Sequence, residues 1–143
     1  MKKLFGASLS SKQLEDFIFF LDRSLGKLIV AETLKQAGAL IEGHDDHFAP
    51  DAKDEHWLRE VGQRNWIVLT KDRRIRYRTA ECSVLLENGV RAFVLTGKDL
   101  TGPEMGTIFA SALPKMLELA SEEEGSFIAR ITRSGKVDVI LRG

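Results

Sequence analysis

The chain has 143 residues, of which 43% are hydrophobic and 29% are charged, with 21 basic and 21 acidic side chains. This length and balance indicate one globular domain over residues 1–143 and exclude a disordered chain. The single cysteine excludes an internal disulfide, and no apolar run approaches the ~18 residues of a membrane span. We therefore expect a cytoplasmic protein that does not associate with membranes.

The charges are segregated along the chain although they cancel overall. Residues 42–60 contain seven acidic and two basic side chains, whereas residues 71–78 contain five basic and one acidic. Two solvated faces are the plain interpretation of this pattern. The functional interpretation is that neighbouring regions of the protein bind a cation and a polyanion.

The first part of the chain predicts two strands with a helix between them. The continuous apolar run 17–21 is typical of a strand buried on both faces, as in a parallel sheet. Ser24 is interpreted as the N-cap of a helix that stops before Gly38. Residues 39–42 predict a shorter strand, and residues 44–53 predict an irregular polar loop.

The middle of the chain continues the alternation of helix and strand. Asp54 begins a helix, and residues 66–70 form the clearest strand in the sequence, which ends before Asp72. Residues 80–87 predict a further helix and residues 91–95 a fourth strand.

The last part of the chain predicts a long helix and a hairpin. The helix starts near Pro103, a residue favoured in the first helical turn, and Pro114 should kink it or split it in two. Two alternating segments, 127–131 and 137–141, flank a short turn and predict a β-hairpin over about 126–141.

The order of these elements predicts the fold class. Strands that alternate with helices indicate an α/β domain with a mainly parallel sheet of about four strands and right-handed crossovers. The core covers about residues 17–120, and the hairpin is added at the end.

Three aspartates fall at one predicted edge of this sheet. Asp22 and Asp72 each follow a strand, and Asp54 begins a helix that runs back antiparallel to the strands. Ligands bind at the carboxyl edge of open α/β sheets, and clustered carboxylates repel one another unless a cation such as Mg²⁺ or Mn²⁺ joins them. Such an ion assists phosphoryl transfer. The candidates for contacting a phosphate backbone are Lys71, Arg73, Arg74, Arg76 and Arg78.

Other interpretations of these polar residues stay open. An aspartate after a strand is often a helix N-cap or a turn residue. His44, His47 and His56 suggest zinc, but no second pair of strong ligands follows them. Cys82 lies in an apolar segment, which favours a packed thiol over a nucleophile.

Several enzymes and switches of similar architecture are excluded or weakened. The turn after the first predicted strand lacks the glycine pattern of a dinucleotide site, and the chain has no Walker A motif. The same turn lacks the second acid of a haloacid-dehalogenase phosphatase. A receiver-like signalling domain, phosphorylated on Asp72, remains an alternative.

Three segments resemble those of a known family. Residues 19–26, 54–58 and 67–75, in this order and spacing, resemble a PIN-like domain, and most of all the compact bacterial branch related to VapC-type toxins. The resemblance implies a three-layer α/β/α fold and cleavage of single-stranded RNA by a water bound to Mg²⁺ or Mn²⁺.

Site residues are carried over from that family by position. Asp22, Asp54 and Asp72 match its metal ligands, and Thr70 would support the site through its hydroxyl group. The family usually has one more acid. The candidates for it are Glu32, in the first predicted helix, and Asp51, in the loop before Asp54.

The leading hypothesis is therefore a Mg²⁺-dependent endoribonuclease. The resemblance adds a narrower one, the toxin of a toxin–antitoxin module, with an antitoxin protein as partner and a homodimer as the assembly. A PIN-like module that binds RNA or protein without catalysis is the second hypothesis, and it predicts salt-sensitive RNA binding without metal-dependent cleavage.

Overall fold

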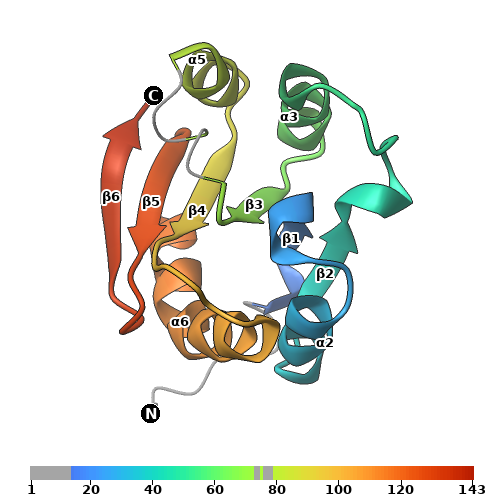
Figure 1. Cartoon of the computed structure of the whole chain (residues 1–143). Coiled ribbons are helices and arrows are strands. Elements are labelled where there is room, and N and C mark those ends of the chain that lie inside the picture. The colour runs from blue at the N-terminus through green and yellow to red at the C-terminus, as the bar shows by residue number, and fades with distance from the viewer. Residues whose placement is uncertain (1–13, 73–74, 76–78) are drawn as a thin grey trace.

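The computed structural model of the protein describes residues 14–72, 75 and 79–143. Figure 1 shows a sheet between two helical layers. Helices α2 (Ile29–Gln36) and α6 (Gly102–Glu122) cover one face. Helices α3 (Asp54–Gln63) and α5 (Thr79–Glu87) cover the other. The predicted three-layer α/β/α fold is confirmed.

The described strands form one six-stranded sheet in the order β2-β1-β3-β4-β5-β6. Neighbours from β2 to β5 pair in parallel, and β6 pairs with β5 in the antiparallel sense. The predicted hairpin is confirmed, and its first strand extends the parallel sheet rather than standing apart from it. The strands are β1 (Ile18–Leu21), β2 (Leu40–Gly43), β3 (Ile67–Thr70), β4 (Arg91–Leu95), β5 (Phe127–Ile131) and β6 (Val137–Arg142).

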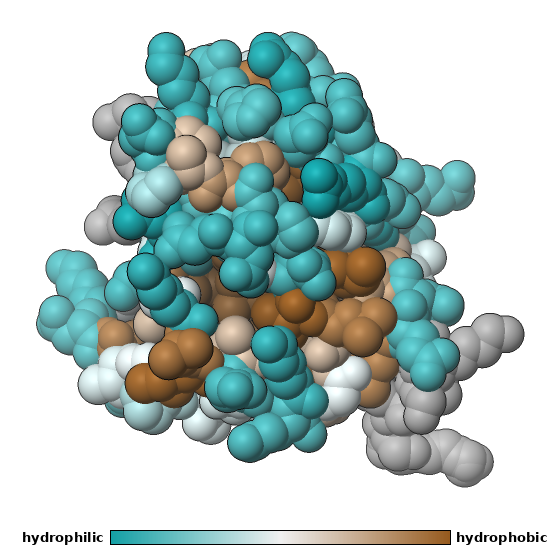
Figure 2. Space-filling view, turned by 90° about the vertical axis from the view of Figure 1, so that its right-hand side faces the viewer, coloured by the Kyte–Doolittle hydropathy of each residue, from teal (hydrophilic) through white to brown (hydrophobic). Residues whose placement is uncertain are grey.

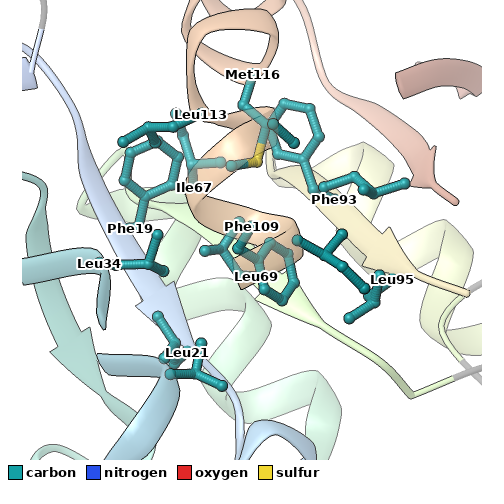
Figure 3. Close-up of a cluster of buried hydrophobic side chains, with 14 of the residues drawn as sticks. Phe19, Leu21, Leu34, Ile67, Leu69, Phe93, Leu95, Phe109, Leu113 and Met116 are labelled. Atoms are coloured by element: carbon teal, nitrogen blue, oxygen red, sulfur yellow. The ribbon is translucent and has the colours of Figure 1, made fainter. Parts of the chain in front are cut away.

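Alternating side chains of the central strands supply two hydrophobic cores. Phe19 and Leu69 point to the α2 and α6 side, where they pack against residues such as Phe109 of α6, as Figure 3 shows. Phe20 and Val68 point to the other side and pack against α3 and α5. A strand covered on both faces must be apolar at every position, which explains the continuous apolar runs of the sequence.

The turn after β1 differs from the prediction. Ser24 lies inside a short 3-10 helix, η1 (Arg23–Leu25), and α2 begins only at Ile29. Asp22 is the N-cap of η1, because its carboxylate accepts a hydrogen bond from the Ser24 backbone N–H. The prediction that Ser24 is the N-cap was wrong, because Asp22 already has the capping geometry two residues earlier.

Helix α6 is longer than a proline in its middle would suggest. It runs from Gly102 to Glu122 without interruption through Pro114, so the predicted split is wrong. A capping box starts the helix, with the Thr101 hydroxyl accepting from the Glu104 N–H at 3.2 Å. Burial of one apolar face against the sheet offsets the hydrogen bond that Pro114 cannot make.

The face on the β2 side carries apolar surface, which Figure 2 shows as a brown band between hydrophilic residues drawn in teal. Leu28 and Ile29 before and in α2 are exposed, as is Leu40 of the edge strand β2. Within the ranges that the structure describes, no helix has the length and apolar character needed to cross a bilayer.

Candidate carboxylate site

The pairing of β1 with β3 places the ends of these two strands side by side. Leu21 is in register with Leu69, and the Asp22 N–H donates to the Leu69 carbonyl at 3.2 Å. The chain then leaves β1 through Asp22 and leaves β3 through Thr70, at the carboxyl edge of the sheet. Residues 48 positions apart thus meet at one point.

Both carboxylate oxygens of Asp22 accept hydrogen bonds. The Oδ1 atom accepts from the Ser24 backbone N–H at 2.9 Å and from the Ser24 hydroxyl. The Oδ2 atom accepts from the hydroxyl of Thr70. Asp22 and Thr70 are both buried, so these bonds fix the carboxylate in one orientation.

The same two hydroxyls also hold the chain that leaves β3. The Asp72 backbone N–H donates to Thr70 Oγ1 at 2.9 Å. The Lys71 backbone N–H donates to Ser24 Oγ at 3.0 Å. The half-buried segment that carries Asp72 is therefore tied to the end of β1.

Burial raises the pKa of the Asp22 carboxyl above its ordinary value, and the negative charge of Asp72 raises it further. Hydrogen bonds from Ser24 and Thr70 oppose this rise in the pKa because they stabilise the ionised form. The structure therefore brings Asp22 and Asp72 close enough for their charges to interact.

Asp54 occupies the first position of α3, as predicted. Its carboxylate accepts from Trp57 Nε1 at 2.9 Å, one turn along the helix. In the described part of the chain, no three His, Cys, Asp or Glu side chains gather into a group that could hold a metal ion. The structure thus joins Asp22 with Asp72, and the role of Asp54 as a third ligand stays a prediction.

For the two candidate acids and the described part of the basic block, the structure gives exposure and position along the chain but no contact with Asp22. Asp51 and Glu32 are exposed, the first in the loop before α3 and the second in the first turn of α2. Lys71 is half-buried and directly follows Thr70. The other four predicted RNA contacts, Arg73, Arg74, Arg76 and Arg78, lie outside the described residues.

A pocket of about 590 Å³ opens beside Asp22. Arg23 and Lys27 contribute to its wall, and both pair with Asp45, at 3.4 and 3.5 Å. Arg23 also donates to the Pro50 carbonyl at 2.7 Å, which ties η1 to the loop that leads to α3. The remaining lining residues are Leu21, Gly26, Leu28, Ala31, Lys35, Ile41, Gly43, His44 and Asp46.

The surroundings of His44, His47 and Cys82 suit a structural role rather than a catalytic one. His44 is buried between the rings of Phe20 and Phe48, and His47 pairs with Glu42 at 2.6 Å. Burial raises the pKa of the Cys82 thiol, as does the charge of the neighbouring Glu81, which disfavours the reactive thiolate.

The donor set suits a small hard cation. Mg²⁺ is commonly held by one or two carboxylates with water in its other positions. Asp22 and Asp72 supply two carboxylates at a sheet edge, and the described residues contain no group of three His, Cys, Asp or Glu side chains of the kind that a structural zinc ion needs. These residues therefore fit Mg²⁺ or Mn²⁺ better than zinc.

The sequence did not indicate the contacts that Ser24, Arg23 and Lys27 make at the site. Ser24 has a recognisable signal, because a hydroxyl two residues after a strand-ending aspartate can reach that carboxylate. The partners of Arg23 lie 22 and 27 residues away along the chain, so no local pattern predicts them.

Comparison with known proteins adds the family. The model of a family described as "PIN like domain" matches residues 17–97, which is more than half of the chain. The protein belongs to the PIN-like domain family. The matched region runs from the residue before β1 to the residues after β4, and so contains Asp22, Asp54 and Asp72.

One similar curated protein carries a functional name. The chain is 27% identical over 125 residues to a protein named "Putative ribonuclease VapC45" from Mycobacterium tuberculosis, with 85% of this chain and 90% of that protein covered. No solved structure gives a significant match to the chain. The predicted relationship to VapC-type PIN-like proteins is confirmed.

Proposed function

We propose that this protein is a Mg²⁺- or Mn²⁺-dependent endoribonuclease that cleaves single-stranded RNA. The observation that carries the proposal is the Thr70 hydroxyl, which donates to Asp22 and accepts from the Asp72 backbone N–H at the carboxyl edge of the sheet. Asp22 is buried and its two oxygens are held by hydroxyl groups from two chain segments. A carboxylate buried where its ionised form is disfavoured is typical of a functional site.

In this proposal Asp22 and Asp72 hold the metal ion, and Asp54 is the third ligand. Thr70 keeps Asp22 oriented through its hydroxyl group. The ion, when bound, supplies an activated water and neutralises charge on the reacting phosphate. Asp51 or Glu32 is the candidate that would complete the acidic set in this proposal.

The RNA is held by positive charge close to the carboxylates. Lys71 directly follows Thr70, so its ammonium group is available for the phosphate next to the one that is cleaved. The four arginines of residues 73–78 extend this positive segment. The pocket beside Asp22 combines apolar Leu28 with cationic Lys27, a mixture that suits a nucleotide.

The test measures Mn²⁺ binding and RNA cleavage for the wild type, Asp22→Asn and Asp72→Asn. We expect both substitutions to reduce cleavage at least 100-fold and to weaken Mn²⁺ binding, because each removes a ligand charge. Asp16→Asn is the matched control, because this exposed aspartate precedes β1 at the opposite edge of the sheet. Full activity of Asp22→Asn would contradict the proposal.

A non-catalytic PIN-like module is the second candidate. One observation favours this candidate: the described residues contain no group of three side chains that could hold a metal ion. This candidate predicts RNA binding that weakens with salt and is lost when the basic charges at Lys71 and in residues 73–78 are reversed. It also predicts no cleavage at any Mg²⁺ or Mn²⁺ concentration, which separates it from the first candidate.

The biological setting that we propose follows from the family. We place the activity in the cytoplasm, as the toxin of a toxin–antitoxin module with an antitoxin partner and a homodimeric assembly. Co-expression with the product of a neighbouring gene should suppress RNA cleavage. The PIN-like family match covers Asp72, the residue that a receiver-like domain would phosphorylate. The PIN-like function is therefore proposed in place of the receiver-like alternative.

A further inference from the structure

Two hydrogen-bond relays converge on the Asp22 carboxylate. In the first, the Lys71 backbone N–H donates to Ser24 Oγ, and the Ser24 hydroxyl donates to Asp22 Oδ1. In the second, the Asp72 backbone N–H donates to Thr70 Oγ1, and the Thr70 hydroxyl donates to Asp22 Oδ2. Consecutive backbone amides therefore reach the two oxygens of one carboxylate through two different hydroxyls.

The direction of each relay follows from the donors available. A backbone N–H can only donate, so both hydroxyl oxygens accept from the segment after β3. Each hydroxyl has one proton, and both protons are directed at Asp22. The 3.2 Å contact between Ser24 Oγ and Thr70 Oγ1 shows that the relays lie side by side, so a change in one is felt by the other.

We propose that Ser24 is a positioning residue that sets the orientation of Asp22 relative to Asp72 for metal binding. The inference rests on the proposed function, because it assigns a role to Ser24 in that same site. Ser24 connects the end of β1 with the segment that carries Asp72, so both carboxylates are in place before an ion arrives. Partners of this kind around metal ligands commonly change metal affinity 10- to 100-fold.

The surroundings of Ser24 separate this role from a purely structural one. The residue is exposed and contributes nothing to the two hydrophobic cores. Among the described residues, its hydroxyl donates to Asp22, accepts from the Lys71 backbone N–H, and lies 3.2 Å from the Thr70 hydroxyl oxygen. Removal of its hydroxyl should therefore alter the site while leaving the fold intact.

The experiment titrates Mn²⁺ into metal-free wild type, Ser24→Ala and Ser24→Thr and measures the dissociation constant directly by calorimetry. We expect Ser24→Ala to bind Mn²⁺ about 10-fold more weakly. Ser24→Thr keeps the hydroxyl and should restore the affinity to within about 3-fold of the wild type. Ser121→Ala is the matched control, because this exposed serine also has a bonded hydroxyl, donated to Leu117 of α6.

Thermal unfolding in EDTA confirms that each variant is folded, and Ser24→Cys replaces Ser24→Ala as the deciding variant if the alanine protein is not. Equal Mn²⁺ affinity in the wild type and the deciding variant overturns this inference and leaves the proposed function standing. A wild type that binds no Mn²⁺ overturns both.

A cycle with Thr70→Val tests the coupling of the two relays. Because Ser24 and Thr70 hold the same carboxylate, the double variant should lose less affinity than the product of the two single losses. Two strictly multiplicative losses in Mn²⁺ affinity would overturn the joint positioning of Asp22.

Discussion

Asp22 has two roles that a sequence pattern presents as alternatives. It caps η1 through the Ser24 N–H, and the Thr70 hydroxyl also links it to the backbone of Asp72, whose charge raises its pKa. The structural interpretation of this residue is therefore confirmed, and its role as a metal ligand stays a prediction that the cap does not exclude. A carboxylate that is buried beside another negative charge costs stability, which links the site to the free energy of unfolding.

Asp22→Asn should stabilise the metal-free protein at neutral pH, because it removes a buried negative charge that Asp72 repels. The pKa of Asp22 is raised in the folded state, so the folded protein binds more protons than the unfolded chain between the two pKa values. The unfolding free energy of the wild type therefore falls as pH rises through this window, and Asp22→Asn removes that component.

Urea unfolding in EDTA at a series of pH values between 4 and 8 measures this difference. The gain of Asp22→Asn should shrink toward low pH, where Asp22 is protonated in both states. A variant that is less stable than the wild type at pH 7 would show that the hydrogen bonds of the ionised carboxylate outweigh its burial and its repulsion by Asp72.

The Cys82 thiol should react slowly with alkylating reagents. Its thiol is partly buried, its pKa is raised, and its Sγ donates to the Ile75 carbonyl at 2.7 Å. We expect alkylation by iodoacetamide at pH 7 to be at least several-fold slower than that of free cysteine, because little thiolate is present. Cys82→Ala should keep RNA cleavage within about 2-fold of the wild type, and a large loss would reopen the nucleophile interpretation.

At the scale of elements, α3 depends on a close approach to the turn before β4. A Cβ added to Gly62 would lie 2.4 Å from the Asn88 carbonyl oxygen, a backbone atom that cannot move cheaply. Gly62→Ala should therefore lower the unfolding free energy by about 1–3 kcal/mol, even though alanine favours a helix. Because α3 starts at Asp54, the substitution should also reduce RNA cleavage.

Gly125→Ala is the control for that prediction. Nothing lies within 4 Å of a Cβ at Gly125, so its effect should stay within about 0.5 kcal/mol. Denaturant unfolding of both variants gives the comparison, and equal stability of Gly62→Ala and Gly125→Ala would contradict the packing of α3.

The elements also show what local sequence can predict. Apolar runs predicted the central strands β1, β3 and β4, because burial on both faces leaves a strong pattern, whereas β5 was predicted only as one half of the hairpin. The cap at Asp22 was one of the interpretations that the sequence left open, because it is a local contact with the Ser24 N–H. The uninterrupted helix through Pro114 was not singled out, since it depends on burial against the sheet, outside its own segment. For the same reason the sequence indicated Asp22 and Asp72 but not the hydroxyl of Ser24 that links their segments.

At the scale of the whole molecule, a net charge of zero means that RNA must be attracted locally. If all five bases of residues 71–78 contact phosphates, the logarithm of the RNA binding constant should fall with the logarithm of salt concentration with a slope of about −3.5. Filter binding of a single-stranded RNA in EDTA, from 50 to 300 mM KCl, measures this slope.

Charge reversal at Lys71 tests the same idea with one residue. Lys71→Glu should weaken RNA binding and make the slope shallower by about one unit, whereas Lys115→Glu on the exposed surface of α6 should change neither. A slope near zero for the wild type would show that the basic segment does not bind the RNA backbone.

The pairing of β1 with β3 has a consequence for a protein under synthesis. Asp22 leaves the ribosome early, but its partner hydroxyl on Thr70 follows 48 residues later, after β2 and α3. Until β3 has emerged and inserted beside β1, the nascent chain contains no carboxylate pair. Under the proposed function, a nascent chain whose β3 has not yet emerged therefore lacks the metal site that cleavage of its own messenger would need.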